Sequence, residues 1–473
     1  METVPQEIFQ AIFNEVEEYP KKFKPYLTVS RRWQRTVEQF YFSRLRIKNT
    51  DLSTFATLFH PPNTHRKALI RSLTLEVQLP AYEGDNYHQH EELNNQVFSA
   101  AILELFQVLE TFNNDEDVKR NARRGNRLEL HISSISSPND NFYSLDYTPK
   151  ILGVYIQLLN YEKLPTLSCV SACFSGHGCS RRLDPASGIL IISKMKDLKV
   201  SKLDYYDSRE CINDETRKII RPAFANALST CTHTLGEFDL RMRYSSPIDE
   251  ASSPPNYVPV SSRADPMNLA LHEFIQRANI STFHASSGSH VISPDFFWPY
   301  DNTKAAPIPF WPNLKDLCVT ASPATPDGSW YFMGDPNVAS HSKFTGATAG
   351  KDLQISLDTE ENRNRFRNVP IPERMDPLLM AMARAICHAP SIERLDLSFD
   401  NIELAPKYVK AEGLKRQFEI CYSATGSKGY FHDDDPMIEN PLLMCDVQDW
   451  RPNKEVESWW MKALGPDGVI MYR

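Results

Sequence analysis

Apolar residues recur at two different spacings along the chain, and each spacing predicts a type of element. Near the N-terminus they lie three or four positions apart, which places them on one face of an α-helix: Ile8, Phe9, Ile12, Phe13 and Val16. We therefore predict a helix over residues 5–18, which the prolines at 20 and 25 bring to an end. A second helix is predicted from Ser30, a suitable N-cap, to Phe42, and a strand over 45–47.

Beyond residue 48 a helical segment is repeatedly followed by a short, strand-like run. Four such units are predicted, with helix and strand at 96–112 and 128–132, 214–230 and 235–240, 266–278 and 280–284, and 377–389 and 392–397. Further strands without a clear preceding helix are predicted at 72–77, 198–203, 314–319 and 418–421. Alternating helices and strands of this kind are typical of an α/β fold.

Two of the predicted helices have the same start signal. Asp265-Pro266 and Asp376-Pro377 each place an aspartate at the N-cap and a proline at the first helical position. The aspartate side chain accepts hydrogen bonds from free amides of the first turn, and proline has no amide to leave unpaired there. We therefore predict that helices begin at residues 266 and 377.

Several strands resemble the signature of leucine-rich repeats, L-x-x-L-x-L. The closest are N-L-K-D-L-C-V at 313–319 and S-I-E-R-L-D-L-S at 391–398. Because the predicted strands are irregularly spaced, we predict an irregular leucine-rich-repeat-like α/β solenoid, with parallel strands on one face and helices on the other. An irregular α/β domain with one mixed sheet is the alternative. Segments 244–266 and 321–352, rich in Ser, Pro or Gly, are either domain breaks or loops.

Residues 4–47 carry the most specific motif of the chain. It reads V-P-Q-E-I-F-Q-A-I-F from Val4, L-T-V-S-R-R-W from Leu27 and F-S-R-L-R-I from Phe42. The motif resembles the F-box family, whose pattern is Leu-Pro-x-Glu-Ile/Leu, a helix, and then Val-Ser-x-x-Trp. Val4 replaces the commoner leucine, and segment 19–26 lacks the leucines usual in the family.

The F-box resemblance implies a helical module, residues 1–48, followed by a leucine-rich-repeat-like body, residues 49–473. In the family such a module docks on a Skp-type adaptor and, through it, on a cullin. Segments 297–298, 310–319 and 326–332 also resemble a group of fungal F-box-like proteins of the same architecture. The residues implied for adaptor docking or for the module core are Val4, Pro5, Ile8, Ile12, Leu27, Val29 and Trp33.

Composition and charge narrow the possible functions. The 17 glycines among 473 residues are few for a nucleotide enzyme with glycine-rich loops, whereas 41% hydrophobic residues suit a sizeable core. The net charge of −8 disfavours nucleic acid or an anionic membrane as the main partner, although residues 20–48 hold nine basic residues and one acid. The sequence lacks a predicted membrane span and a secretory signal, so we expect a cytoplasmic or nuclear protein.

The sequence motifs predict no catalytic residue, metal or cofactor. Residues 346–351 are one residue short of a phosphate-binding loop, and Asp352 stands where that loop has Ser or Thr. The group Cys169, Cys173, His177 and Cys179 lacks the spacing of a structural zinc site. We interpret its cysteines as buried or loop thiols.

Two predicted loops, 294–312 and 321–335, are rich in aromatic residues. Most large aromatic side chains are expected to anchor the core or the loops, but aromatics on exposed loops are also typical of recognition surfaces. The candidate contacts for a target protein are Trp298, Trp311, Trp330 and Tyr331.

Three hypotheses for function follow. The first is a non-catalytic substrate receptor of a Skp–cullin–F-box ubiquitin ligase, which binds the adaptor through its N-terminal module and an unknown target protein through the solenoid. The second is a repeat scaffold or interaction protein without any ligase, in which the N-terminal helices are only a cap. The third is an enzyme whose site is assembled from distant residues.

Overall fold

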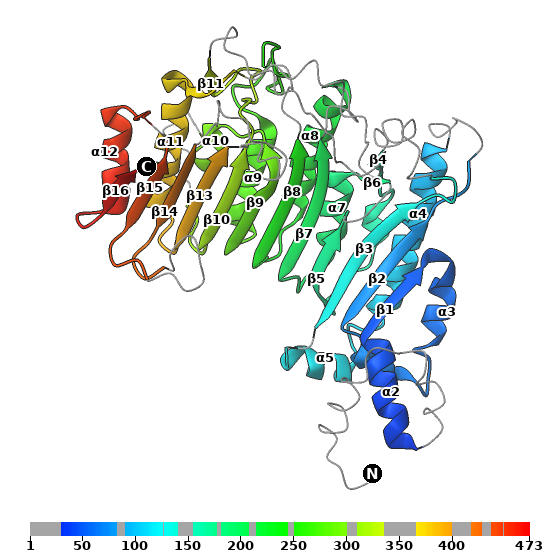
Figure 1. Cartoon of the computed structure of the whole chain (residues 1–473). Helices are drawn as coiled ribbons and strands as arrows, with labels where there is room; N and C mark the ends of the chain where they lie inside the picture. The colour runs from blue at the N-terminus through cyan, green and yellow to red at the C-terminus, as the bar shows by residue number, and fades with distance from the viewer. Residues whose placement is uncertain are drawn as a thin grey trace, which may run out of the picture.

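The strands of the main sheet lie side by side in the order in which they occur in the sequence. The structure, a computed structural model, describes residues 30–82, 90–125, 127–140, 155–176, 181–207, 214–244, 250–299, 310–334, 366–399, 418–427, 437–447 and 449–473. Within these ranges the fold is mixed α/β, with one large, mostly parallel sheet (Figure 1). Its strands are β1 (Arg44–Lys48), β2 (Ser72–Gln78), β3 (Leu128–Ser136), β5 (Val170–Ser175), β7 (Val200–Asp207), β8 (Glu237–Tyr244), β9 (Thr282–His290), β10 (Asp316–Ala321), β13 (Arg394–Phe399), β14 (Glu419–Ser423), β15 (Leu442–Asp446) and β16 (Val469–Tyr472).

Most of the helices lie behind this sheet, two of those near the N-terminus lie below the lower ends of the strands, and no helix of the described chain covers the opposite face (Figure 1). All pairs from β1 to β13 are parallel, and each crossover adds the next strand on the same side of the last one. Because such crossovers are right-handed, a constant direction of growth keeps all their helices on one face. The helices are α2 (Arg31–Ser43), α3 (Leu52–Thr57), α4 (Glu91–Glu110), α5 (Glu116–Arg123), α7 (Pro185–Ile192), α8 (Asp214–Thr230), α9 (Pro266–Arg277), α10 (Pro294–Phe297), α11 (Pro372–Cys387) and α12 (Lys454–Leu464), with 3₁₀ turns η3 (Asn49–Asp51), η4 (Thr64–Leu69) and η5 (Tyr161–Lys163).

The C-terminal end of the sheet departs from the parallel pattern. β14 pairs antiparallel with β13 and with β15, and β16 returns to a parallel pairing with β15. Two small sheets stand apart from the main one: β4 (Tyr155–Ile156) with β6 (Arg182–Leu183), and β11 (Phe332–Met333) with β12 (Val369–Pro370). None of the helices among the described residues is long and apolar enough to cross a membrane.

A pair of hydrogen bonds to one shared carbonyl oxygen recurs where the central strands begin. One carbonyl oxygen at the start of a strand accepts the amides of two consecutive residues at the start of the next, at 2.8–3.1 Å. The amides of residues 236 and 237 bond to Lys199 O, those of 281 and 282 to Gly236 O, those of 315 and 316 to Ser281 O, and those of 393 and 394 to Lys315 O. We call this arrangement the entry turn. It sets the register of each strand against its neighbour.

The entry turn explains why four predicted strands, those at 235, 280, 314 and 392, begin two residues too early, and the strand predicted at 198 is shifted by the same amount. In each case the first apolar residue of the predicted strand lies before the strand and is buried: Leu198, Leu235, Ile280, Leu314 and Ile392. This residue fills the gap between the end of a helix and the sheet. In L-x-x-L-x-L, the first leucine therefore belongs to the turn, and only the later two alternate along the strand.

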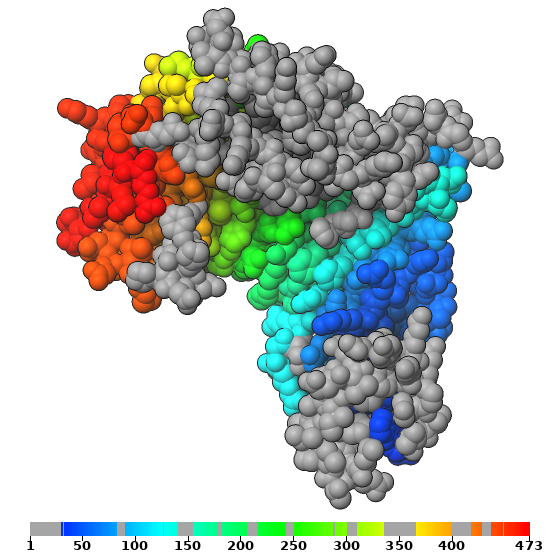
Figure 2. All heavy atoms as spheres, viewed as in Figure 1, coloured from blue at the N-terminus to red at the C-terminus, as the bar shows by residue number. Residues whose placement is uncertain are grey.

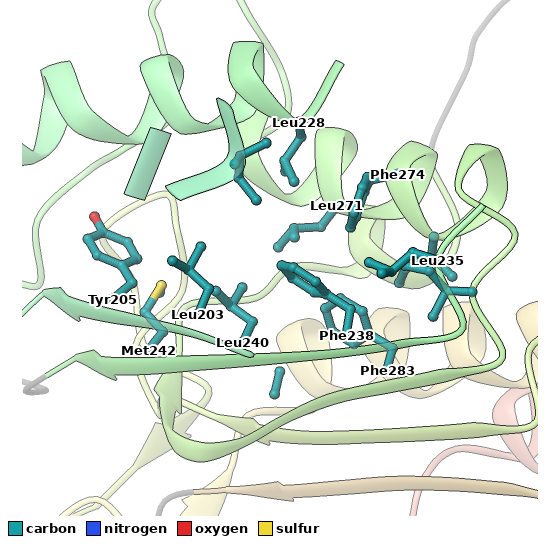
Figure 3. Packing of buried hydrophobic residues seen from close by; sticks show 14 of the residues in the cluster. Leu203, Tyr205, Leu228, Leu235, Phe238, Leu240, Met242, Leu271, Phe274 and Phe283 are labelled. Atoms are coloured by element: carbon teal, nitrogen blue, oxygen red, sulfur yellow. The ribbon is translucent and has the colours of Figure 1, made fainter. Parts of the chain in front are cut away.

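The core lies between the sheet and its helices. Leu203 of β7 and Phe238 and Leu240 of β8 point toward α8 and α9, where they face residues such as Leu228 and Phe274 (Figure 3). Each of these five side chains is at most 1% exposed. The cluster to which they belong is continuous from Ile47 of β1 to Trp460 of α12, so a single core joins both ends of the sheet.

One of the two predicted helix starts is confirmed and the other is wrong. Asp265 caps α9 by accepting a hydrogen bond from Asn268 N, and Pro266 is the first helical residue. In contrast, α11 already begins at Pro372, so Pro377 lies inside the helix. Asp376 there accepts a hydrogen bond from the Asn453 side-chain amide, at 2.7 Å. Pro372, five residues before Pro377, is also suited to the first helical position. Packing of the longer helix against α12 favours this earlier start.

Neither candidate break interrupts the sheet. β8 and β9 pair directly on either side of 244–266, and β10 and β13 pair on either side of 321–352. Residues 44–48, which the sequence assigns to the N-terminal module, form β1 and pair with β2. The first strand of the sheet therefore follows α2 without a linker.

We expect Leu240→Ala to destabilise the fold by about 2–5 kcal/mol, because it leaves a cavity between β8 and its covering helices. Ile219→Ala, at a site that is 71% exposed on α8, is the control and should change stability by less than about 0.5 kcal/mol. The free energy of unfolding, measured in urea, tests both. Equal effects of the two substitutions would contradict the position of the core.

Candidate functional site

The helix-free face of the sheet carries a continuous row of paired residues that crosses every strand. Side chains alternate between the two faces of a strand, so residues paired across strands share a face. We call this set the central row. From β1 to β16 it consists of Arg46, Thr74, His131, Phe174, Lys202, Asp239, His284, Cys318, Asp396, Cys421, Met444 and Met471.

The middle of the central row is built of ion pairs. Lys202 Nζ lies 3.7 Å from Asp239 Oδ2, to which Arg241 Nε donates a hydrogen bond of 3.1 Å. Arg241 Nε also lies 3.9 Å from Asp204 Oδ1. The two carboxylate side chains are at most 10% exposed, whereas the lysine and arginine side chains are about a third exposed. The acids thus form the floor of this surface, and the cations extend over them.

His284 extends the charged region toward β10. Its Nε2 lies 3.4 Å from Asp316 Oδ2, on the neighbouring strand. The hydrogen bond to this carboxylate raises the pKa of His284 above the ordinary value of 6.5, although partial burial acts in the opposite direction. The imidazole therefore holds its proton to a higher pH than a free histidine does.

An acidic group follows on β13 and β14. Burial raises the pKa of Asp396 despite its ion pair with Arg394, and the carboxylate is only 2% exposed. Glu419 also has a raised pKa, first from burial and then from the charges of Asp396 and Asp446. Burial raises the pKa of the neighbouring Cys318 thiol to about 12, so it stays protonated and is a poor nucleophile at neutral pH.

Toward its two ends, on the outer strands of the sheet, the central row contains fewer charged residues than at its centre. Toward the N-terminal edge, the rings of His131 and Phe174 stack at 4.6 Å with an interplanar angle of 13°, and Arg46 pairs with Glu76 at 3.2 Å. Toward the C-terminal edge the row ends in Met444 and Met471. Figure 2 shows this face of the molecule, and the N-terminal ends of the strands from β3 to β10 are visible on it.

The described residues bring together a wide polar surface instead of an enclosed pocket. Two small, largely apolar cavities, one below β14 and β15 and one below β8 and β9, have a volume of about 10 Å³ each, the room needed for one water molecule. No group of three or more His, Cys, Asp or Glu residues in the described ranges has the geometry to hold a metal ion. Cys169 and Cys173 are buried, and residues 177 and 179 lie outside those ranges.

Most of the predicted adaptor-docking residues lie outside the described residues: Val4, Pro5, Ile8, Ile12, Leu27 and Val29. Trp33 is described and lies half-buried in the first turn of α2. Its backbone amide donates to Ser30 Oγ at 3.3 Å, as the predicted N-cap requires. The predicted helix from Ser30 and the strand after it are thus confirmed as α2 and β1.

Helix α2 is held on the body by its only acidic residue, Glu38. The carboxylate accepts hydrogen bonds from Arg66 Nη2 at 2.7 Å and from Gln34 Nε2 at 3.2 Å, and lies 3.1 Å from His65 Nε2. Burial of Glu38 acts to raise its pKa, but these three partners outweigh it and keep the pKa below the ordinary 4.5. Val37 is fully buried beside this ion pair. The helix is therefore fixed to η4 by a buried charge as well as by apolar contact.

Three of the four candidate target contacts are buried and do not form an exposed surface. Trp311 Nε1 donates to His272 O at 3.4 Å, Trp330 Nε1 donates to Ser252 O at 3.3 Å, and Tyr331 Oη donates to Ile292 O at 3.1 Å. Exposed fractions of 3%, 6% and 1% respectively make them loop anchors, the general expectation for large aromatic residues. Trp298 is half-buried, with its ring 5.0 Å from that of His388.

The central row is a candidate site that local sequence patterns do not predict. Its signal is present in runs such as S-K-L-D at 201–204 and E-F-D-L-R at 237–241, where charged residues alternate with core residues. The alternation identifies the exposed side of one strand, but the pairs that cross between strands, Lys202 with Asp239 and His284 with Asp316, join residues more than 30 positions apart. Comparison of the chain with protein-family models, with curated proteins and with solved structures finds no match.

We expect the folded-state pKa of His284 to lie above 6.5 and to fall in Asp316→Asn. A raised pKa means that the pair stabilises the fold fully below the unfolded pKa, and that this contribution is lost as the pH rises through the folded pKa. Titration by NMR of the imidazole protons measures the shift, and thermal unfolding at several pH values measures the loss. An unchanged midpoint in the variant would contradict the assigned partner.

Proposed function

We propose that this protein is a substrate-recognition subunit of a Skp–cullin–F-box ubiquitin ligase. The observation that carries the proposal is the direct attachment of α2, the described part of an F-box-like motif, to the first strand of a sheet with a wide helix-free face. The N-terminal module docks on the adaptor, and the helix-free face holds the target protein. The chain itself performs no bond chemistry.

The body of the protein, in this proposal, is an irregular leucine-rich-repeat-like solenoid. Its support is structural repetition: the strands follow in sequence order, and the entry turn recurs at residues 199, 236, 281 and 315 with a buried apolar residue beside each. The spacing between these positions varies, so the repetition lies in the backbone geometry and not in a fixed sequence period. Repeats of this type present an extended strand face to their ligands.

A rigid connection between the docking helix α2 and the helix-free face suits the proposed mechanism. Such a receptor accelerates ubiquitin transfer by raising the effective concentration of target lysines near the charged enzyme, and that gain depends on geometry. The Glu38 contacts and the absence of a linker between α2 and β1 restrict motion between the docking helix and the binding face. The charged central row supplies specificity through its fixed pattern of acids and cations.

Adaptor binding is tested by co-purification of the tagged full-length chain with a recombinant Skp-type adaptor. We expect the wild type to retain the adaptor, and the triple variant Pro5→Ala/Ile8→Asp/Trp33→Ala to lose at least about tenfold in affinity. Arg35→Ala, an exposed position on α2, is the control and should bind like the wild type. Failure of the wild type to bind any Skp-type adaptor would contradict the proposal.

The alternative function is a scaffold or interaction protein in which the N-terminal residues only cap the body. A truncation that removes residues 1–29 keeps α2, the Glu38 contacts and β1. If the removed part is a docking module, the remainder should stay folded, with an unfolding temperature close to that of the full chain, and should lose adaptor binding. Cooperative unfolding at a much lower temperature, measured by circular dichroism, would favour the cap.

A further inference from the structure

The two edges of the main sheet differ in charge. β1, at one edge, exposes Arg44, Arg46 and Lys48, and charged residues on an edge strand oppose pairing with another strand. β16, at the other edge, reads V-I-M-Y and has no charge. It forms the end of the sheet at the left of Figure 1 and pairs only with β15 among the described strands.

Half of the peptide groups of β16 point away from the sheet. The amides of Val469 and Arg473 donate to carbonyl oxygens of the β15 side, Pro441 O and Cys445 O, each at 2.9 Å. In a strand, successive residues direct their N–H and C=O groups to opposite edges. The groups of Ile470 and Tyr472 therefore lie on the open edge, in position to pair with a further strand.

The exposed side chains beside this edge are apolar. Val469 is 44% exposed and Met471 is 41% exposed, and both lie on the helix-free face. On the other side of the sheet, α12 packs against β16 and exposes 44% of Met461. Apolar groups thus flank the free peptide groups on both faces, which is the arrangement that a strand-adding partner buries.

We propose that β16 pairs antiparallel with β16 of a second copy of this chain, about a two-fold axis through Ile470. Only outward-facing residues can exchange hydrogen bonds, and this register pairs Ile470 with its own copy. It also lets the Tyr472 amide donate to the carbonyl oxygen of residue 468, whose own amide is bonded to Gly465 O. It also places Val469 opposite the partner's Met471, so that apolar groups meet across the axis. Asp467, in the turn before β16, and Arg473, directly after β16, carry opposite charges, and the register brings each close to the other residue of the second copy.

The pairing joins the two main sheets into one and leaves both N-terminal edges at the far ends. A two-fold contact of this kind is closed, because each copy uses the one uncharged edge of its main sheet as described, and the other described edge is charged. The proposal does not depend on adaptor binding, since β16 and α2 lie at opposite ends of the sheet. The contact is small, so we expect a dimer that dissociates on dilution.

Sedimentation velocity of the full-length chain over a range of concentrations tests the proposal. We expect the wild type to form dimers at about 100 µM, a concentration suited to weak contacts of this size. Met471→Lys places a charge on the edge and should raise the dimer dissociation constant at least about tenfold. Met437→Lys, at another exposed methionine, is the matched control and should dimerise like the wild type.

A second pair of variants tests the register. Val469→Asp alone should also be monomeric, but its mixture with Met471→Lys should dimerise, because the register places the new carboxylate opposite the new ammonium group. Recovery in the mixture also shows that both variants are folded. A wild type that stays monomeric, a Met471→Lys variant that dimerises normally, or a mixture that stays monomeric would each overturn the proposal.

Discussion

The shared carbonyl at the start of each central strand is the interaction on which the rest of the structure depends. By accepting two consecutive amides of the next strand, it fixes where that strand begins and in which register it runs. The buried apolar residue beside it ties the same point to the end of the preceding helix. Once register is fixed, side-chain alternation assigns every following residue to the core or to the helix-free face. The turn therefore determines the core and the surface together.

A sheet that grows in one direction has an unusual consequence for a mostly parallel fold. Parallel sheets are generally covered by helices on both faces, but here right-handed crossovers place the helices on one face. On the helix-free face, side chains have to be compatible with water and with the side chains of adjacent strands. Charged and polar residues paired in register meet both requirements. Asp204 and Asp239 can be held at the base of this surface because Arg241 and Lys202 extend over them. Ionic pairing of this kind gives specificity to a binding surface more than it gives stability.

The two ends of the sheet are finished in different ways. At the N-terminal end, Glu38 joins α2 to η4, and exposed cations line the edge strand. At the C-terminal end the strand direction reverses twice, and β16 leaves an uncharged edge. A basic helix fixed at one end and a strand free to pair at the other place two possible interactions far apart on one continuous core. Because the core is shared, movement of one end relative to the other would require its disruption.

Local patterns in the chain were enough to predict α8, α9, the Ser30 N-cap and the alternating strands, because helix periodicity and capping act over a few residues. They also predicted a mixed fold of helices and parallel strands, whereas Trp311, named as a candidate target contact, is buried. Local patterns misplaced the start of α11, since the choice between Pro372 and Pro377 is made by packing and by the Asn453 contact. They also missed the central row and the contrast between the edges. Which residues meet across strands depends on register between segments far apart in the chain, and only the folded backbone sets it.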